Sequence, residues 1–219
     1  MAGPFSVVSH LIRDRDYLYE AVRERGGLWP RIGVLAAAAV VSSALYGFAM
    51  GANHSWSQAL SSAVKTPLMF ALTLLVTLPA LYSMTTLVGG KLRLDQLVML
   101  LVMAVAITSV VLAAWAPVTF VYGISQSSYV FMVLMNVFVF ATAGATGAAL
   151  MTVSLVRATR HGRPRIFVIQ AVWVVLYGFV GGQMSWALRP FICRPGTPFV
   201  WYRAISGNFY EVVFRLIFG

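Results

Sequence analysis

The composition of this 219-residue chain excludes a soluble globular protein. Of its residues, 60% are hydrophobic and only 10% are charged, and the mean hydropathy is +0.83, whereas soluble domains carry about 25% charged residues. The net charge of +10 predicts basic loops and contacts with anionic lipid headgroups rather than a nucleic-acid partner. The single cysteine, Cys193, excludes an internal disulfide and a cysteine-based metal cluster.

The first predicted element is an amphipathic helix at residues 4–26, whose apolar side chains recur every three or four residues. Gly26 and Gly27 end this helix, and Trp29 follows at the expected depth of the lipid headgroups. Two interpretations stay open for the helix: it lies on the membrane surface, or it docks a partner protein. The N-terminus lacks the basic-then-apolar order of a cleavable signal, so the first span is expected to direct membrane insertion.

Five spanning helices are predicted next, since about 20 apolar residues cross the hydrocarbon core of a bilayer. Residues 96–156 contain no Lys, Arg, Asp or Glu and hold two of these spans, separated by a polar turn. The polar loop 52–64 has room for a short surface helix, and Pro67 is placed in the first turn of the second span. The predicted spans are residues 32–50, 65–87, 96–122, 129–156 and 166–188.

Small residues predict two close helix contacts, because they let neighbouring backbones approach each other. Gly47 and Gly51 form a G-x-x-x-G at the end of the first span, and packing within the protein is favoured over dimerisation as its use. The patch 144–149, made of Gly, Ala and Thr, predicts a second contact. Asn136 is expected to form a hydrogen bond between helices.

The C-terminal residues 189–219 are predicted not to span the membrane. They contain three prolines and four arginines. The amphipathic pattern from 206 to 218 is only about 20 Å long as a helix, which is too short to cross. A Pro-rich surface loop followed by an interfacial helix is therefore expected.

The distribution of basic residues predicts a cytoplasmic N-terminus. With five spans, eleven of the sixteen Lys and Arg residues fall on the side of the N-terminus and five on the far side. Lys65 is counted on the far side, at the start of the second span, and the other four belong to the C-terminal segment. The predicted location is therefore the inner (cytoplasmic) membrane, with several passes.

The distribution of ionisable residues argues against catalysis, cofactor binding and ion-coupled transport. All six carboxylates lie outside the predicted hydrocarbon zone, and no ionisable side chain is predicted at depth, where coupled transporters place such groups. The three histidines, at positions 10, 54 and 161, do not form a cluster. Neither a metal site nor a nucleophile with an adjacent base is therefore expected.

The segment 183–191 is the strongest candidate contact site. Gln183, Trp186 and Arg189 are spaced by three residues and share a face of a helix that is expected to end at Pro190. Either Trp186 anchors the interface while Arg189 extends to the outer surface, or Arg189 joins a buried polar cluster. In the second case, its partners are carbonyls freed by the prolines of the second and third spans, or a lipid phosphate. The residues predicted to contact lipid or a partner are Trp29, Trp186, Arg189, Arg194, Trp201, Arg203 and Arg215.

Two short stretches, residues 183–191 and the tripeptide Asn208-Phe209-Tyr210, resemble motifs of a group of uncharacterised multispanning bacterial membrane proteins. This resemblance covers a few tens of residues and implies a bacterial source, but no activity. A cytoplasmic amphipathic segment followed by five spans also resembles the topology of Yip1-type membrane proteins.

These observations predict an all-α polytopic membrane bundle of three parts: an N-terminal cytoplasmic or interfacial helix at 1–31, five transmembrane helices at 32–188, and a loop with an interfacial helix at 189–219. The expected function is that of a non-catalytic subunit that scaffolds or anchors a larger membrane assembly. Its expected partners are membrane lipids and protein subunits, with no cofactor. The alternative is a channel or passive permease component that uses the proline-kinked spans. A membrane enzyme that binds lipid phosphate through Arg189 and Arg194 is the third hypothesis.

Overall fold

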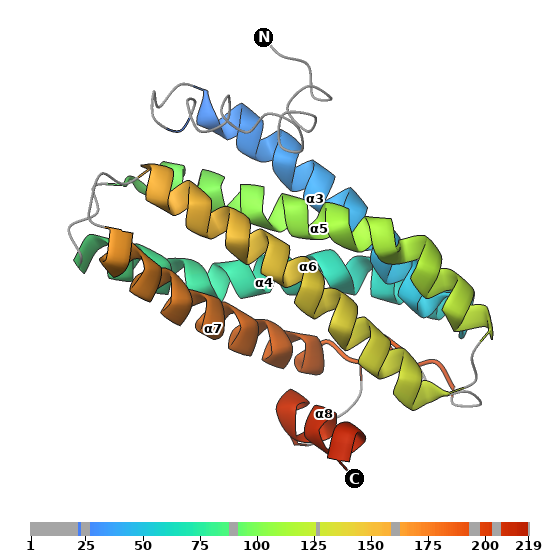
Figure 1. Ribbon diagram of the computed structural model, residues 1–219. Helices are drawn as coiled ribbons and strands as arrows, with labels where there is room; N and C mark the ends of the chain where they lie inside the picture. Colours follow the sequence, from blue (N-terminus) through green and yellow to red (C-terminus); the bar gives the residue numbers. More distant parts are fainter. Residues whose placement is uncertain are drawn as a thin grey trace.

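The computed structural model describes residues 22, 27–87, 92–125, 128–158, 163–192, 198–202 and 207–218 (Figure 1). The amphipathic helix predicted at 4–26 falls outside the described residues except for Val22, as do Arg194 and Arg203, and the side chain of Arg215 is not described either. The helices are α3 (Leu28–Gly51), α4 (Trp56–Leu87), α5 (Leu94–Ser125), α6 (Tyr129–Ala158), α7 (Arg163–Ala187) and α8 (Phe209–Phe218).

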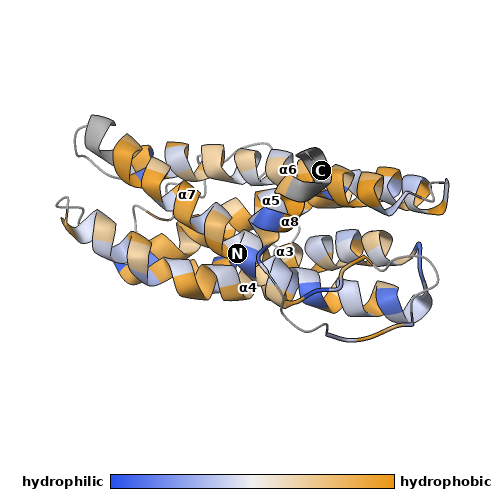
Figure 2. Ribbon diagram, turned by 90° about the horizontal axis from the view of Figure 1, so that it is seen from below, coloured by the Kyte–Doolittle hydropathy of each residue, from blue (hydrophilic) through white to orange (hydrophobic). Residues whose placement is uncertain are grey.

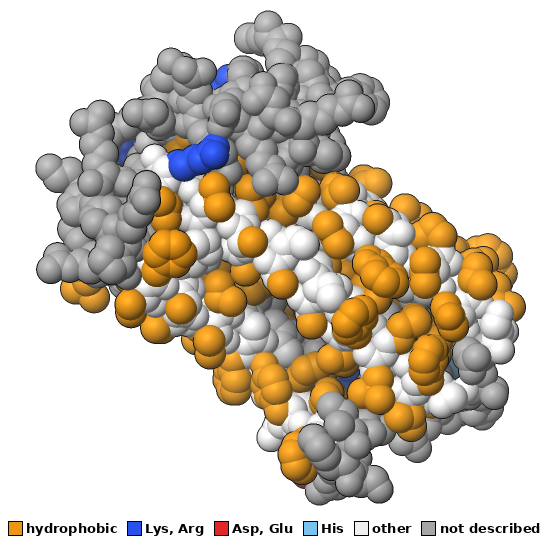
Figure 3. Space-filling model, in the orientation of Figure 1, with side chains coloured by type: hydrophobic (Ala, Val, Ile, Leu, Met, Phe, Trp, Pro, Cys, Tyr) orange, Lys and Arg blue, Asp and Glu red, His pale blue; other side chains and the backbone are white. Residues whose placement is uncertain are grey.

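The predicted fold class is confirmed: the protein is an all-α membrane protein, and α3 to α7 are long and apolar enough to cross a bilayer. α4 and α5 contain 32 residues each, or about 48 Å of helix, so both exceed a hydrocarbon core of about 30 Å. Figure 2 shows hydrophobic residues along all five spans, and Figure 3 shows hydrophobic side chains over the face formed by α5, α6 and α7. Large apolar side chains such as Val175, which is 72% exposed, thus have lipid as their natural surroundings.

The five spans form a ring in the order α6, α5, α3, α4, α7, which differs from their order in the chain. α3 packs extensively against both α4 and α5, α6 packs on α5, and α7 packs on α4. α6 and α7 follow each other in the chain and lie side by side in Figure 1, but they contact each other little. The ring is therefore weakest between α6 and α7.

The contact between α3 and α4 depends on the two glycines of the G-x-x-x-G. A Cβ added to Gly47 would lie 2.3 Å from the carbonyl oxygen of Ser62, and one added to Gly51 would lie 2.6 Å from that of Gln58. Only glycine allows the two backbones to come this close. The prediction that this motif serves packing within the protein is confirmed.

The predicted start of the second span at Lys65, after a separate loop at 52–64, is wrong. One continuous helix, α4, runs from Trp56 through Pro67 and Pro79, so Pro67 does not lie in a first helical turn. Ser55 caps this helix, since its hydroxyl accepts a hydrogen bond of 3.2 Å from the amide of Gln58. The S-x-x-Q spacing of Ser55 and Gln58 is that of a capping box and was the sequence signal for this start.

Candidate functional site

A cavity of about 1020 Å³ lies between α6 and α7, where the ring of helices is weakest. α4 and α5 form its floor, and α8 and residues 189–192 border one end. We call this cavity the α6–α7 groove. Its lining is largely apolar, and Arg189 is the one charged residue among the described residues that line it.

Two glycines on opposite walls keep the groove open. A Cβ added to Gly144 of α6 or to Gly178 of α7 would meet nothing within 4 Å. Gly147, in contrast, packs closely on α5, because its added Cβ would lie 2.9 Å from the carbonyl oxygen of Ala104. The helix contact predicted for the patch 144–149 is therefore confirmed at Gly147, whereas Gly144 faces the groove.

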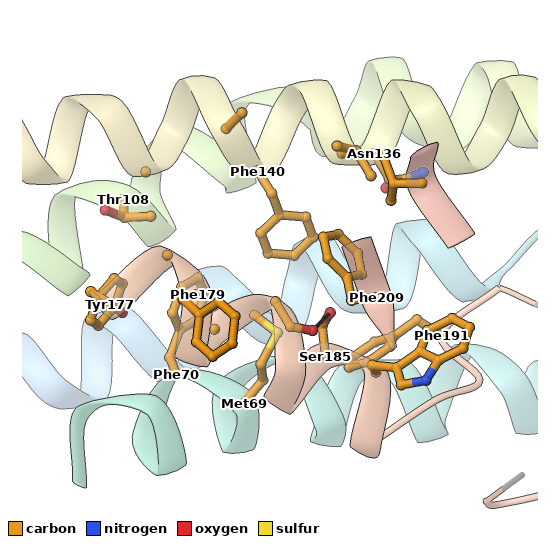
Figure 4. A pocket seen from close by; sticks show the side chains of 18 of the residues that line it. Met69, Phe70, Thr108, Asn136, Phe140, Tyr177, Phe179, Ser185, Phe191 and Phe209 are labelled. Atoms are coloured by element: carbon orange, nitrogen blue, oxygen red, sulfur yellow. Dashed lines mark hydrogen bonds between the residues drawn. The ribbon is translucent and has the colours of Figure 1, made fainter. Parts of the chain in front are cut away.

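Aromatic side chains form the interior of the groove. Figure 4 shows Phe140 pointing from α6 into the cavity, and its ring centroid lies 6.3 Å from that of Phe70 of α4. Tyr46 of α3 meets Phe140 edge to face at 5.5 Å and donates a hydrogen bond of 2.6 Å to Oδ1 of Asn136. The predicted interhelical hydrogen bond of Asn136 is thus confirmed, and it joins α3 to α6 beneath the groove.

Helix α8 is attached to α7 beside the groove. The hydroxyl of Tyr210 donates to the carbonyl oxygen of Gly178 at 2.9 Å, and its ring stacks on Phe179 with centroids 5.5 Å apart. The indole Nε1 of Trp186 donates to the carbonyl oxygen of Gly207 at 3.1 Å. Burial raises the pKa of the Tyr210 hydroxyl above its ordinary value, so this group stays a donor. Seen from its own side in Figure 2, α8 lies in front of the spans.

A buried polar cluster holds the chain that follows α7 against α4. The Nζ of Lys65 donates to the carbonyl oxygens of Pro190, at 3.2 Å, and of Trp201. It also lies 4.9 Å from the ring centroid of Tyr202. Gln58 donates from Nε2 to the carbonyl oxygen of Pro190 at 3.0 Å. We call this set of contacts the Lys65 cluster.

Two further hydrogen bonds complete the Lys65 cluster. Nε2 of Gln58 donates to the carbonyl oxygen of Phe191 at 3.0 Å, and the hydroxyl of Ser62 donates to the same oxygen at 2.7 Å. Gln58, Ser62 and Lys65 share one face of α4 because they follow the i, i+4, i+7 pattern of a helix. The spacing is visible in the sequence, but it indicates a shared face only if residues 58 and 62 belong to the same helix as Lys65 rather than to a loop.

The placement of Lys65 corrects its predicted position. Lys65 lies inside α4 and is only 1% exposed, so it is a buried cation within a candidate span rather than a residue at the start of one. A cation in a membrane protein interior is costly unless carbonyls or other partners compensate it. The carbonyl oxygens of Pro190 and Trp201 provide that compensation here.

The residues predicted to contact lipid or a partner fall in different places. Trp186 and Arg189 line the groove, and the Cζ of Arg189 lies 3.7 Å from the ring centroid of Trp186, so these two side chains are adjacent as predicted. The expectation that one helix carries both residues up to Pro190 is wrong, because α7 ends at Ala187 and Arg189 follows it. Trp29 is 67% exposed and lies at the start of α3, away from the groove. Trp201 is also exposed, and its carbonyl belongs to the Lys65 cluster.

The fold and the groove define a multi-pass helical membrane protein with five candidate spans and an apolar groove in its side. No family model, no characterised protein and no solved structure matches the chain. The resemblances based on residues 183–191, on residues 208–210 and on the Yip1-type topology therefore stay predictions.

Proposed function

We propose that this protein is a non-catalytic integral membrane protein that binds a membrane lipid, with the acyl chains in the α6–α7 groove. The observation that carries this proposal is the apolar cavity of about 1020 Å³ at the weakest contact of the ring. Apolar cavities offer water few hydrogen-bond partners and take up hydrocarbon instead. In a bilayer, the hydrocarbon that surrounds the protein consists of lipid acyl chains.

The size of the groove favours lipid chains over a whole transmembrane helix of a partner. Ligand pockets in proteins measure about 300–1,000 Å³, so a cavity of about 1020 Å³ holds a large ligand. A spanning helix of 20 residues is about 30 Å long and about 10 Å wide, which corresponds to a cylinder of roughly 2,400 Å³. A partner helix would therefore place only part of its side chains in the groove.

The scaffold or anchor role predicted from the sequence is the second candidate function. Gly144 and Gly178 support it, because open glycines on two neighbouring helices let a further helix approach closely. In that case, the groove receives a ridge of side chains from a partner subunit. Isolation of the protein in a mild detergent, followed by mass spectrometry, separates the two functions, because a stoichiometric partner supports the scaffold and bound lipid supports the first proposal.

The two remaining hypotheses have less support from the geometry. A channel or permease path needs polar or charged groups along its length, whereas the described lining of the groove is mainly apolar. The enzyme hypothesis requires Arg189 together with Arg194, and Arg194 lies outside the described residues.

Filling the groove tests the proposed function. The double substitution Gly144→Leu and Gly178→Leu places two large side chains in open space on opposite walls, and we expect at least a tenfold loss of bound lipid. The reason is that the new side chains occupy the volume that the acyl chains need, while glycine replacement within a helix does not lower helix propensity. Retained lipid is measured by native mass spectrometry, and chain contact by crosslinking with a photoactivatable fatty acid.

Gly33→Leu is the matched control, since a Cβ at Gly33 of α3 also meets nothing within 4 Å but lies outside the groove. This variant should bind lipid like the unmodified protein. If the double variant keeps its lipid and its crosslinking pattern, the groove is not the binding site and the proposal is wrong.

We also propose the orientation of the chain: a bacterial inner-membrane protein with a cytoplasmic N-terminus. If the buried Lys65 is left out of the count, the predicted distribution of basic residues is eleven on the side of the N-terminus and four on the far side, which supports this orientation. In a Cys193→Ser background, Ser57→Cys at one end of α4 should react with an impermeant thiol reagent from outside, and Thr86→Cys at the other end only after the cytoplasmic side is opened. Both residues are exposed, and the reverse pattern would contradict the orientation.

A further inference from the structure

We infer that the lipid bound in the groove is an anionic phospholipid and that Arg189 binds its phosphate. This inference rests on the proposed function, and adds to it the headgroup class and the residue that selects it. It starts from the position of Arg189, which is the one charged residue among the described residues of the groove lining.

The length of α7 is expected to bring Arg189 to the depth of lipid phosphates. α7 contains 25 residues, or roughly 38 Å of helix, which exceeds the hydrocarbon core of about 30 Å. Arg189 comes directly after the end of this helix, and Trp186, one turn earlier, has the side chain that is enriched at membrane interfaces. A lipid with its chains between α6 and α7 therefore has its phosphate at the level of Arg189.

The side chain of Arg189 is arranged to bind an oxyanion. Its Cζ lies 3.7 Å from the ring centroid of Trp186, so the guanidinium is supported by an aromatic ring. The N–H donors of a guanidinium lie in one plane, in a fork that matches two oxygens of a phosphate. Trp186 is itself held by its hydrogen bond to Gly207.

Hydrogen bonds from α4 hold the backbone that follows Arg189. Lys65, Gln58 and Ser62 hold the carbonyls of the next two residues, Pro190 and Phe191, so the backbone at the groove end is fixed.

Charges from the neighbouring elements add to the effect of Arg189. Lys65 brings a second cation, whereas Glu211 is the one carboxylate in the described parts of α4, α7, α8 and residues 188–202. A headgroup with a net negative charge is favoured over a zwitterionic one in this field.

Lipid competition tests the inference. Purified protein is exchanged into an equimolar mixture of phosphatidylglycerol and phosphatidylcholine with identical chains, and the retained lipid is identified by native mass spectrometry. Both lipids offer a phosphate to Arg189, but the choline cation is disfavoured in a positive field, so the unmodified protein should retain phosphatidylglycerol with a preference of roughly tenfold. Arg189→Gln should abolish this preference, and Arg189→Lys should keep most of it because lysine keeps the positive charge.

Arg157→Gln is the matched control, because Arg157 lies in the last turn of α6, at the opposite end of the bundle, and is exposed. It should keep the preference of the unmodified protein. An Arg189→Gln variant that still prefers phosphatidylglycerol overturns the inference. Equal retention of the two lipids by the unmodified protein also overturns it, and this measurement needs no variant to fold.

The outcomes separate this inference from the proposed function. If both lipids are retained equally, but are lost when the groove is filled at Gly144 and Gly178, chain binding stands and the role of Arg189 is wrong. If the unmodified protein retains neither lipid more than the filled variant does, the proposed function itself fails.

Discussion

Replacing Lys65 by methionine is expected to lower the free energy of unfolding by about 2–4 kcal/mol and to release residues 190–192 and 198–202 from α4. Nζ of Lys65 donates to the carbonyl oxygens of Pro190 and Trp201, and hydrogen bonds to charged groups contribute about 1.5–3 kcal/mol each. Part of this loss is offset, because methionine removes a charge whose burial is unfavourable. Methionine donates no hydrogen bond to either of these two carbonyls.

The effect of Lys65→Met is measured in detergent as a fall in the melting temperature of roughly 5–15 °C and as faster hydrogen exchange in residues 190–192 and 198–202. Arg93→Met is the control, since the exposed Arg93 forms an ion pair with the half-buried Asp95 at 3.5 Å, and ion pairs near the protein surface contribute about 0–1 kcal/mol. Gln58→Leu removes the neutral donors of the same cluster and should also destabilise the protein. Unchanged stability and exchange in Lys65→Met would show that the Lys65 cluster does not hold this segment.

Replacing Gly47 by alanine is the second substitution for which we expect a large loss, of about 2–3 kcal/mol. The added Cβ would lie 2.3 Å from the carbonyl oxygen of Ser62 and 2.4 Å from Oγ1 of Thr66, so α3 and α4 must move apart. Overpacking of this kind costs about 1–3 kcal/mol, and a clash with backbone belongs to the upper part of that range. The higher helix propensity of alanine offsets about 1 kcal/mol at most.

The same substitution at Gly33 of α3 is the control for Gly47→Ala, because a Cβ there meets nothing within 4 Å. Thermal unfolding in detergent should show a clear loss for Gly47→Ala and none for Gly33→Ala. If both variants are equally stable, the close approach of α3 and α4 is not a source of stability.

The number and the approximate course of the spans could be predicted from the sequence, because crossing a bilayer is a local requirement. A helix of about 20 apolar residues satisfies its own backbone hydrogen bonds wherever its neighbours lie. Residues 96–156, without a charged side chain, therefore predicted α5 and α6 closely. The same reasoning failed at α4, where serines and glutamines suggested a loop, although Ser55 and Gln58 carried the capping signal of a helix start.

The partners of polar residues depended on tertiary structure. The sequence predicts Lys65 at the start of a span, but it becomes a buried donor once α4 begins at Trp56 and the carbonyls of Pro190 and Trp201 lie against it. The acceptors are backbone carbonyls more than a hundred positions away in the chain. Because every residue has a backbone carbonyl, the residue type does not mark these two as acceptors. No pattern in the sequence could have named Pro190 and Trp201.

The all-α membrane bundle, its five spans and the glycines of the G-x-x-x-G contact follow from the amino-acid sequence. The ring order of the spans, the Lys65 cluster and the α6–α7 groove arise from how the helices pack. Hydrophobicity acts on each helix separately, whereas a cavity exists only where two helices stay apart. Gly144 and Gly147 belong to the same small-residue patch, yet Gly144 faces open space whereas Gly147 packs on α5.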